Sequence, residues 1–331
     1  MRFRGSAATL WCSVLAAVWL QGCAEGFVIP EEPDSGGIPI GEVAYVVQYE
    51  WEDVPAFHDL ALVSGVLFAI QGDGQISAWF SDSAEGRENT SRTLPFPVVH
   101  AAQAYEQPVH LCAGPSNTLW VAFEEPPSLL QFTLSVSPPE PTGLLVRLAA
   151  QAVIGGITAD LDSGYVYVAD AVANTVSKFE PNDVGGQLLI DVATEGNGDG
   201  FVREPHGIFW FDDQLLVADT GKSWLQLLDA DVPQAGRGQI SGPEQDPLQL
   251  RDPVDVWVDA AGYFYVTDTS NNRVLQVEED GQVREEVTQL DPLSAIAPIS
   301  VVANRTQVWV PNAAENRLTV YQINTANEGA P

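Results

Sequence analysis

A repeat with a period of 44 to 52 residues is the feature that most constrains how this chain can fold. Its clearest copy is Asp252–Val277, in which three short β-rich runs are separated by clusters of Asp, Gly, Ser and Asn. Such runs predict strands joined by tight turns. Equivalent anchor positions recur at Ala69, Val121, Val168, Val217, Val266 and Val310. A steady period of this length, with three or four strands per unit, predicts the blades of a β-propeller.

The best copies share a sequence pattern. Tyr165–Asp170 reads YVYVAD and is followed by Asn174, and residues 196–208 read GNGDGFVREPHGI. This pattern resembles the NHL repeat family. The resemblance implies an all-β, six-bladed β-propeller of four-stranded antiparallel blades over residues 42–325. The first two copies are degenerate, with Gln71 and Phe123 where the others carry Asp or Asn.

The two ends of the repeat region predict how the ring closes. The last copy ends with its third strand at Tyr321, and the β-rich run Val43–Tyr49 precedes the first copy without a partner of its own. An unpaired strand edge would favour aggregation. We therefore expect this N-terminal strand to supply the outer strand of the last blade.

The N-terminus resembles a bacterial export signal. Arg2 and Arg4 precede an apolar run, Ala7–Leu20, that is too short to span a bilayer as a helix. The sequence Leu20-Gln21-Gly22-Cys23 resembles a bacterial lipobox. The resemblance implies a signal peptide at 1–22, cleavage before Cys23, and lipidation of that cysteine with acyl chains such as palmitate. An ordinary signal peptide cleaved nearby is the alternative.

The residues after Cys23 predict where the protein resides. The segment 24–41 is rich in Pro, Gly and acidic residues, so 23–41 is predicted to be a lipidated flexible tether. Ala24 follows the cysteine, which favours the outer membrane or cell surface over retention at the inner membrane. Once Cys12 leaves with the signal peptide and Cys23 is lipidated, only Cys112 remains, and we expect a buried free thiol without disulfides.

Net charge excludes one class of partner. The chain has 45 acidic and 14 basic residues, a formal net charge of −31. Such a surface repels phosphate backbones, so nucleic-acid binding is excluded and membrane contact is expected only through the lipid.

The four histidines suggest a site. His58, His110 and His206 each lie eleven residues before their anchor, at the predicted start of an innermost strand. Because innermost strands line the channel of a propeller, these rings could converge on Zn²⁺ or another divalent metal. The NHL-type amidating lyases are similar, because they hold zinc with histidines at the start of inner strands. Asp59 and Asp255 are further candidates near the same channel mouth.

Other acidic motifs are interpreted structurally. Asp170, Asp219 and Asp268 recur at one position of the repeat, which indicates turn capping by their side-chain oxygens. Glu195–Gly200 resembles the first half of a calcium loop, but His206 stands where an EF-type loop would need Glu.

Two classes of function remain open. The first is a monomeric, surface- or periplasm-exposed lipoprotein whose propeller is a binding platform for a protein, a glycan or another ligand. Its rim loops would be the Ser/Pro/Glu-rich insertions 81–107 and 133–153. The second is a metal-dependent lyase or hydrolase with its site at the mouth of the channel.

Overall fold

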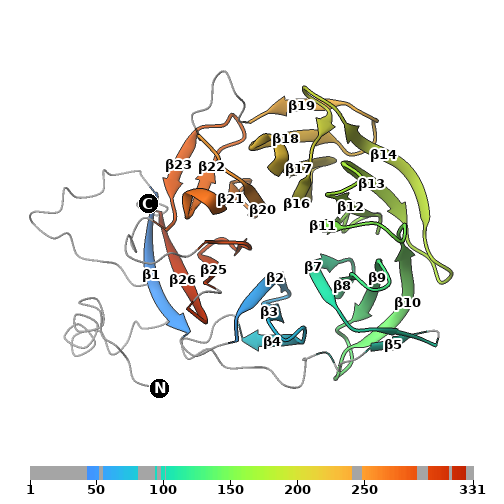
Figure 1. Cartoon of the computed structure of the whole chain (residues 1–331). Coiled ribbons are helices and arrows are strands. Elements are labelled where there is room, and N and C mark those ends of the chain that lie inside the picture. Colours follow the sequence, from blue (N-terminus) through green and yellow to red (C-terminus); the bar gives the residue numbers. More distant parts are fainter. Residues whose placement is uncertain are drawn as a thin grey trace, which may run out of the picture.

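The computed structural model describes residues 43–51, 55–80, 94, 98–100, 102–240, 248–288, 297–312 and 315–325. Its strands assemble into six blades around a central channel, so the predicted six-bladed propeller is confirmed (Figure 1). Every sequence anchor lies on the second strand of its blade. The signal peptide, Cys23 and the tether lie outside the described residues.

In each blade the first strand of the repeat lines the channel, and the later strands follow outward. The strands of blades 1 to 3 are β2 (Phe57–Val63), β3 (Val66–Gln71) and β4 (Ile76–Phe80); β7 (Pro108–Gly114), β8 (Thr118–Phe123), β9 (Ser128–Thr133) and β10 (Glu140–Arg147); and β11 (Ile154–Ala159), β12 (Val166–Asp170), β13 (Thr175–Glu180), β14 (Gln187–Glu195) and β15 (Phe201–Val202).

Neighbouring strands within a blade are antiparallel, except that the short β15 pairs parallel to β14. The strands of blades 4 to 6 are β16 (Pro205–Phe211), β17 (Gln214–Asp219), β18 (Trp224–Asp229) and β19 (Gly236–Gln239); β20 (Pro253–Val258), β21 (Phe264–Asp268), β22 (Arg273–Val277) and β23 (Val283–Glu286); and β24 (Val302–Ala303), β25 (Gln307–Asn312), β26 (Arg317–Thr325) and β1 (Val43–Trp51).

The N-terminal strand closes the ring as predicted. β1 pairs antiparallel with β26, in a register that runs from Val43 opposite Thr325 to Trp51 opposite Leu318. Trp51 is buried and stacks on Trp79 of blade 1, with ring centroids 5.6 Å apart. The closing strand therefore joins blade 6 to blade 1 through side-chain packing as well as backbone pairing.

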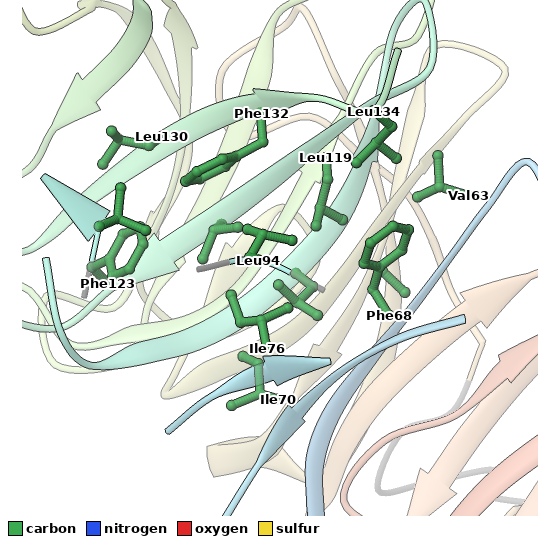
Figure 2. Close-up of a cluster of buried hydrophobic side chains, with 14 of the residues drawn as sticks. Val63, Phe68, Ile70, Ile76, Leu94, Leu119, Phe123, Leu130, Phe132 and Leu134 are labelled. Carbon is green, nitrogen blue, oxygen red and sulfur yellow. The ribbon is translucent and has the colours of Figure 1, made fainter. Parts of the chain in front are cut away.

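One hydrophobic core lies at each of the six interfaces between blades. Figure 2 shows the core between blades 1 and 2, where Phe68 and Ile76 of blade 1 lie near Leu119 and Phe132 of blade 2. Strand side chains alternate between the two faces of a sheet, so each blade packs one face on the preceding blade and the other on the next.

One of the two expected rim loops is not a loop. Within 133–153, residues Glu140–Arg147 form β10, the outer strand of blade 2. Pro141 and Gly143 obscure the strand pattern, and the register shifts between Pro141 and Leu145. In the described part of 81–107, the hairpin β5 (Val98–His100) and β6 (Gln103–Tyr105) forms a separate two-stranded sheet.

The turn capping expected of the repeated aspartates is found at Asp170 only. Asp170 accepts hydrogen bonds from the backbone N–H groups of Val172 and Ala173 in its own turn, and a 3.3 Å contact from Val153 N–H before the first strand of the blade. Asp219 and Asp268 make no side-chain cap hydrogen bond to the turn that follows them, and each accepts instead from a backbone N–H group before the inner strand of its blade. The repeated aspartate is therefore a structural feature of the blade.

Both lysines of the chain are buried. Lys178 pairs with Asp231 of the next blade and lies 4.4 Å from the Tyr165 ring centroid. Lys222, in the 3₁₀ turn η1 (Thr220–Lys222), donates to Phe201 O at 2.7 Å and pairs with Asp219 at 3.0 Å.

Two cationic side chains contact the calcium-like loop Glu195–Gly200, and one of them is Arg203, which donates to Asn197 Oδ1 at 3.1 Å. The Lys222 ammonium also contacts Gly198 O, within Glu195–Gly200, at 3.4 Å. The only other helical element among the described residues is the 3₁₀ turn η2 (Thr269–Asn271). The described part of the chain contains no helix that is long and apolar enough to cross a membrane.

Candidate functional site

The register of the inner strands defines one channel position in each blade. In blades 1 to 5 one residue of the inner strand is the direct partner of the anchor on the second strand, for example Leu60 with Ala69 and Leu111 with Val121. We call the preceding residue the channel position. Around the ring, the channel positions are Asp59, His110, Gly156, Gly207, Asp255 and Ser300.

Polar side chains at this position join neighbouring blades on one side of the ring. Asp255 Oδ2 accepts from Val301 N–H at 2.9 Å, Ser300 Oγ from Leu60 N–H at 3.2 Å, and Asp59 Oδ2 from Leu111 N–H at 2.8 Å. Ser300 Oγ also donates to Asp59 Oδ1 at 3.1 Å. Buried backbone N–H groups need such acceptors, so these side chains stabilise the contacts between blades 5, 6, 1 and 2.

The opposite side of the ring carries glycine at the channel position. A Cβ atom on Gly156 would lie 2.5 Å from His206 O, and one on Gly207 would lie 2.6 Å from Asp255 Cα. Neither distance is sterically possible. Blades 3, 4 and 5 therefore approach through backbone contact, where the other blades approach through polar side chains.

The three histidines do lie at the starts of inner strands, but their equal spacing does not give them one register. The turn after the inner strand has two residues in blades 1 and 4 and three in blade 2. His58 and His206 consequently precede the channel position, whereas His110 occupies it. A one-residue difference moves a strand side chain to the other face.

Only His110 of the three is among the residues that line the channel cavity. Its Nε2 donates to Ile154 O at 3.0 Å and its Nδ1 lies 3.4 Å from Asp59 Oδ2. His206 Nδ1 donates to Glu204 O at 3.0 Å, and the exposed His58 lies beside Gly72 of its own blade. In the described part of the chain, no three His, Cys, Asp or Glu side chains form a group that could hold a metal. The three-histidine metal site stays a prediction.

The channel contains a cavity of about 410 Å³. Five inner strands line it, and most of the lining is apolar, including Phe209, Phe211 and Trp257. The titratable groups that interrupt this surface on the inner strands are Asp59, His110, Cys112 and Asp255. The two aspartates suspected from the sequence therefore belong to the same site.

Burial and mutual charge shift the protonation of this cluster. Burial, followed by the negative charge of Asp59, raises the pKa of Asp255 to about 7. Burial opposes protonation of His110, but the hydrogen bond and charge of Asp59 outweigh it and raise the pKa of the imidazole. Burial lowers the pKa of His206.

Cys112 is a buried free thiol, as expected from the sequence. Burial and the Asp59 charge both raise its pKa, so little nucleophilic thiolate forms at neutral pH. A cysteine nucleophile is therefore not part of the chemistry that this cavity supports.

Comparisons with solved structures show the fold. Similar structures include a streptogramin B lyase (TM-score 0.55, 14% identity, 87% of this chain and 90% of that chain covered). They also include YCF48 bound to D1 peptide (0.51, 11%, 83% and 79%) and the WD40 β-propeller domain of Doa1 (0.58, 10%, 84% and 96%). No family model matches the chain.

Sequence reasoning missed Ser300 and the two channel glycines. Ser300 is fully buried, and it precedes a two-residue strand too short to show a pattern. The signal that could have found all six positions is the register of each inner hairpin, which requires the turn lengths as well as the anchors.

The pKa of Asp255 predicts a pH-dependent stability difference. A carboxyl whose pKa rises on folding favours the native state when protonated, so its contribution falls as pH rises from about 4 towards and past 7. We therefore compare the free energy of unfolding of Asp255→Asn with that of the unmodified protein. On going from pH 5 to pH 8.5, we expect this difference to shift in favour of the variant by at least about 1.4 kcal/mol, which corresponds to one pKa unit. Urea unfolding at both pH values measures this difference. The exposed Asp162→Asn is the control, and an equal difference at both pH values for Asp255→Asn would contradict the prediction.

Proposed function

We propose that this protein is a binding protein whose ligand site is the channel cavity of an exported, lipid-anchored propeller of NHL type. The observation that carries the proposal is the cavity itself. Its volume of about 410 Å³ lies in the range of small-molecule sites, about 300–1,000 Å³. A mostly apolar wall with a few convergent polar groups is typical of such sites.

The contacts of the polar groups favour binding over catalysis. Asp59, Asp255 and Ser300 each accept a backbone N–H from the next blade, and His110 donates to Ile154 O. Groups held in this way are well placed to orient a ligand. The similar structures include lyases and a propeller bound to a peptide, and one fold commonly hosts unrelated functions.

Filling the cavity is expected to abolish binding. Ala113 is a half-buried residue of β7 that lines the cavity, and Ala113→Trp places an indole in that space. We expect the neutral apolar dye N-phenyl-1-naphthylamine to gain fluorescence with the unmodified protein and to lose at least tenfold in affinity with this variant. Ala173→Trp, at an exposed turn, is the matched control. Equal dye binding by both variants, with matching thermal unfolding midpoints, would refute a channel site.

Export and anchoring rest on the sequence Leu20–Cys23, and we propose that Cys23 carries the lipid. The propeller would then lie at the outer membrane or cell surface, where protein or glycan partners could contact its rim. We expect mass spectrometry of the mature N-terminus to find acyl chains on Cys23, and Cys23→Ser to release the protein from membranes. An unmodified cysteine at this position would rule out the anchor.

A metal-dependent lyase or hydrolase is the second candidate, supported by the position of His110 and Asp255 in the cavity wall. In the present arrangement both ring nitrogens of His110 have protein neighbours, so the three histidines do not fit a zinc site without rearrangement. If this candidate holds, protein purified without metal-chelating resin carries about one zinc, copper or iron per chain, and His110→Ala and His206→Ala each lose it. Elemental analysis without stoichiometric metal rules the candidate out.

A further inference from the structure

The charge of the cavity wall restricts what can occupy it. Asp59 and Asp255 lie on inner strands and Asp212 lies in the turn after β16, whereas no lysine or arginine is among the lining residues. The one lining group that can carry positive charge is His110, and its Nδ1 faces Asp59. None of the ion pairs among the described residues includes Asp255. Its two carboxylate oxygens accept the backbone N–H groups of Val256 and Val301, and the charge that it shares with the cavity is opposed only at a distance by His110.

The aromatic side chains of the cavity lie at a defined distance from the Asp255 carboxylate. Asp255 and Trp257 are two residues apart on β20 and both line the cavity, so their side chains point to the same side about 7 Å apart along the strand. The Trp257 indole is fixed by a hydrogen bond from its Nε1 to Ala303 O at 2.8 Å. Phe209 of blade 4 packs against it, with ring centroids 4.8 Å apart.

The electrostatic field of the whole chain also favours a cationic ligand. A formal net charge of −31 attracts cations and repels anions over the surface, and a low-dielectric channel concentrates that field. Aromatic faces beside a carboxylate also favour organic cations through cation–π attraction.

We propose that the channel cavity binds small organic ammonium compounds, with the ammonium at Asp255 and an apolar or aromatic body against Trp257 and Phe209. This inference rests on the proposed function, since it names the ligand class of the same cavity. Charge complementarity selects this class over neutral or anionic molecules of equal shape.

The test uses three probes of one shape and different charge. Isothermal titration calorimetry of the purified protein compares 4-phenylbutylammonium, 4-phenylbutanol and 4-phenylbutanoate at pH 8.5, where Asp255 is ionised and the ammonium is still charged. We expect the ammonium to bind at least tenfold more tightly than the alcohol, and the carboxylate to bind most weakly. Raising NaCl from 50 to 500 mM should weaken the binding of the ammonium compound and leave the affinity for the alcohol unchanged, because salt screens the charge interaction.

Variants locate the charge. We expect Asp255→Asn to reduce ammonium affinity to the level of the alcohol and to leave alcohol affinity within twofold, whereas Asp162→Asn changes neither. The charge series on the unmodified protein decides the matter if Asp255→Asn does not fold.

The outcomes separate the two proposals. Equal affinity for ammonium and alcohol, or tightest binding of the carboxylate, overturns the ammonium class and leaves the channel as a ligand site. If no probe binds but N-phenyl-1-naphthylamine does, the ammonium class again falls and the proposed function stands. If the dye also fails to distinguish the cavity variant, the proposed function falls too.

Discussion

Packing between neighbouring blades is the interaction on which the rest of this structure depends. A single four-stranded sheet would expose an apolar face on each side, and no blade here has a core of its own. Each apolar face is covered only because another blade lies on each side. The chain therefore gains its stability from a closed ring, and the strand β1, distant in sequence from its partner β26, supplies the final contact.

The same requirement shapes the channel. The polar channel positions satisfy backbone groups where the inner strands are held apart by side chains, and glycine allows direct backbone contact where they are close. Asp59 and Asp255 thus have fixed positions before any ligand arrives. A site formed in this way is rigid, because moving either carboxylate would break a contact between two blades. Rigid polar groups in an apolar cavity favour selectivity by charge.

Much of the fold followed from the sequence. The six anchors predicted the blades because each lies in a buried second strand, where apolar β-branched residues dominate, and the unpartnered run Val43–Tyr49 correctly predicted ring closure. The candidate site was harder to predict from the sequence. Counting eleven residues back from an anchor gave His58, His110 and His206 one position, but the extra turn residue in blade 2 placed His110 beside Asp59 instead. Spacing along the sequence therefore identifies equivalent strands, but it does not fix the register of two strands when the turn between them changes length. Pro141 and Gly143 concealed the outer strand of blade 2 for a related reason, since they disrupt the pattern that would mark a strand.

The burial of both lysines has a consequence for the chemistry of the folded surface. Lys178 is held between a tyrosine ring and Asp231, and Lys222 is enclosed by Asp219 and loop carbonyls. With no other lysine in the sequence, the folded propeller offers amine-directed reagents almost no side chain to acylate. Acetylation or biotinylation of Lys178 and Lys222 would accordingly report the opening of blades 3 and 4, because neither side chain is accessible in the native fold.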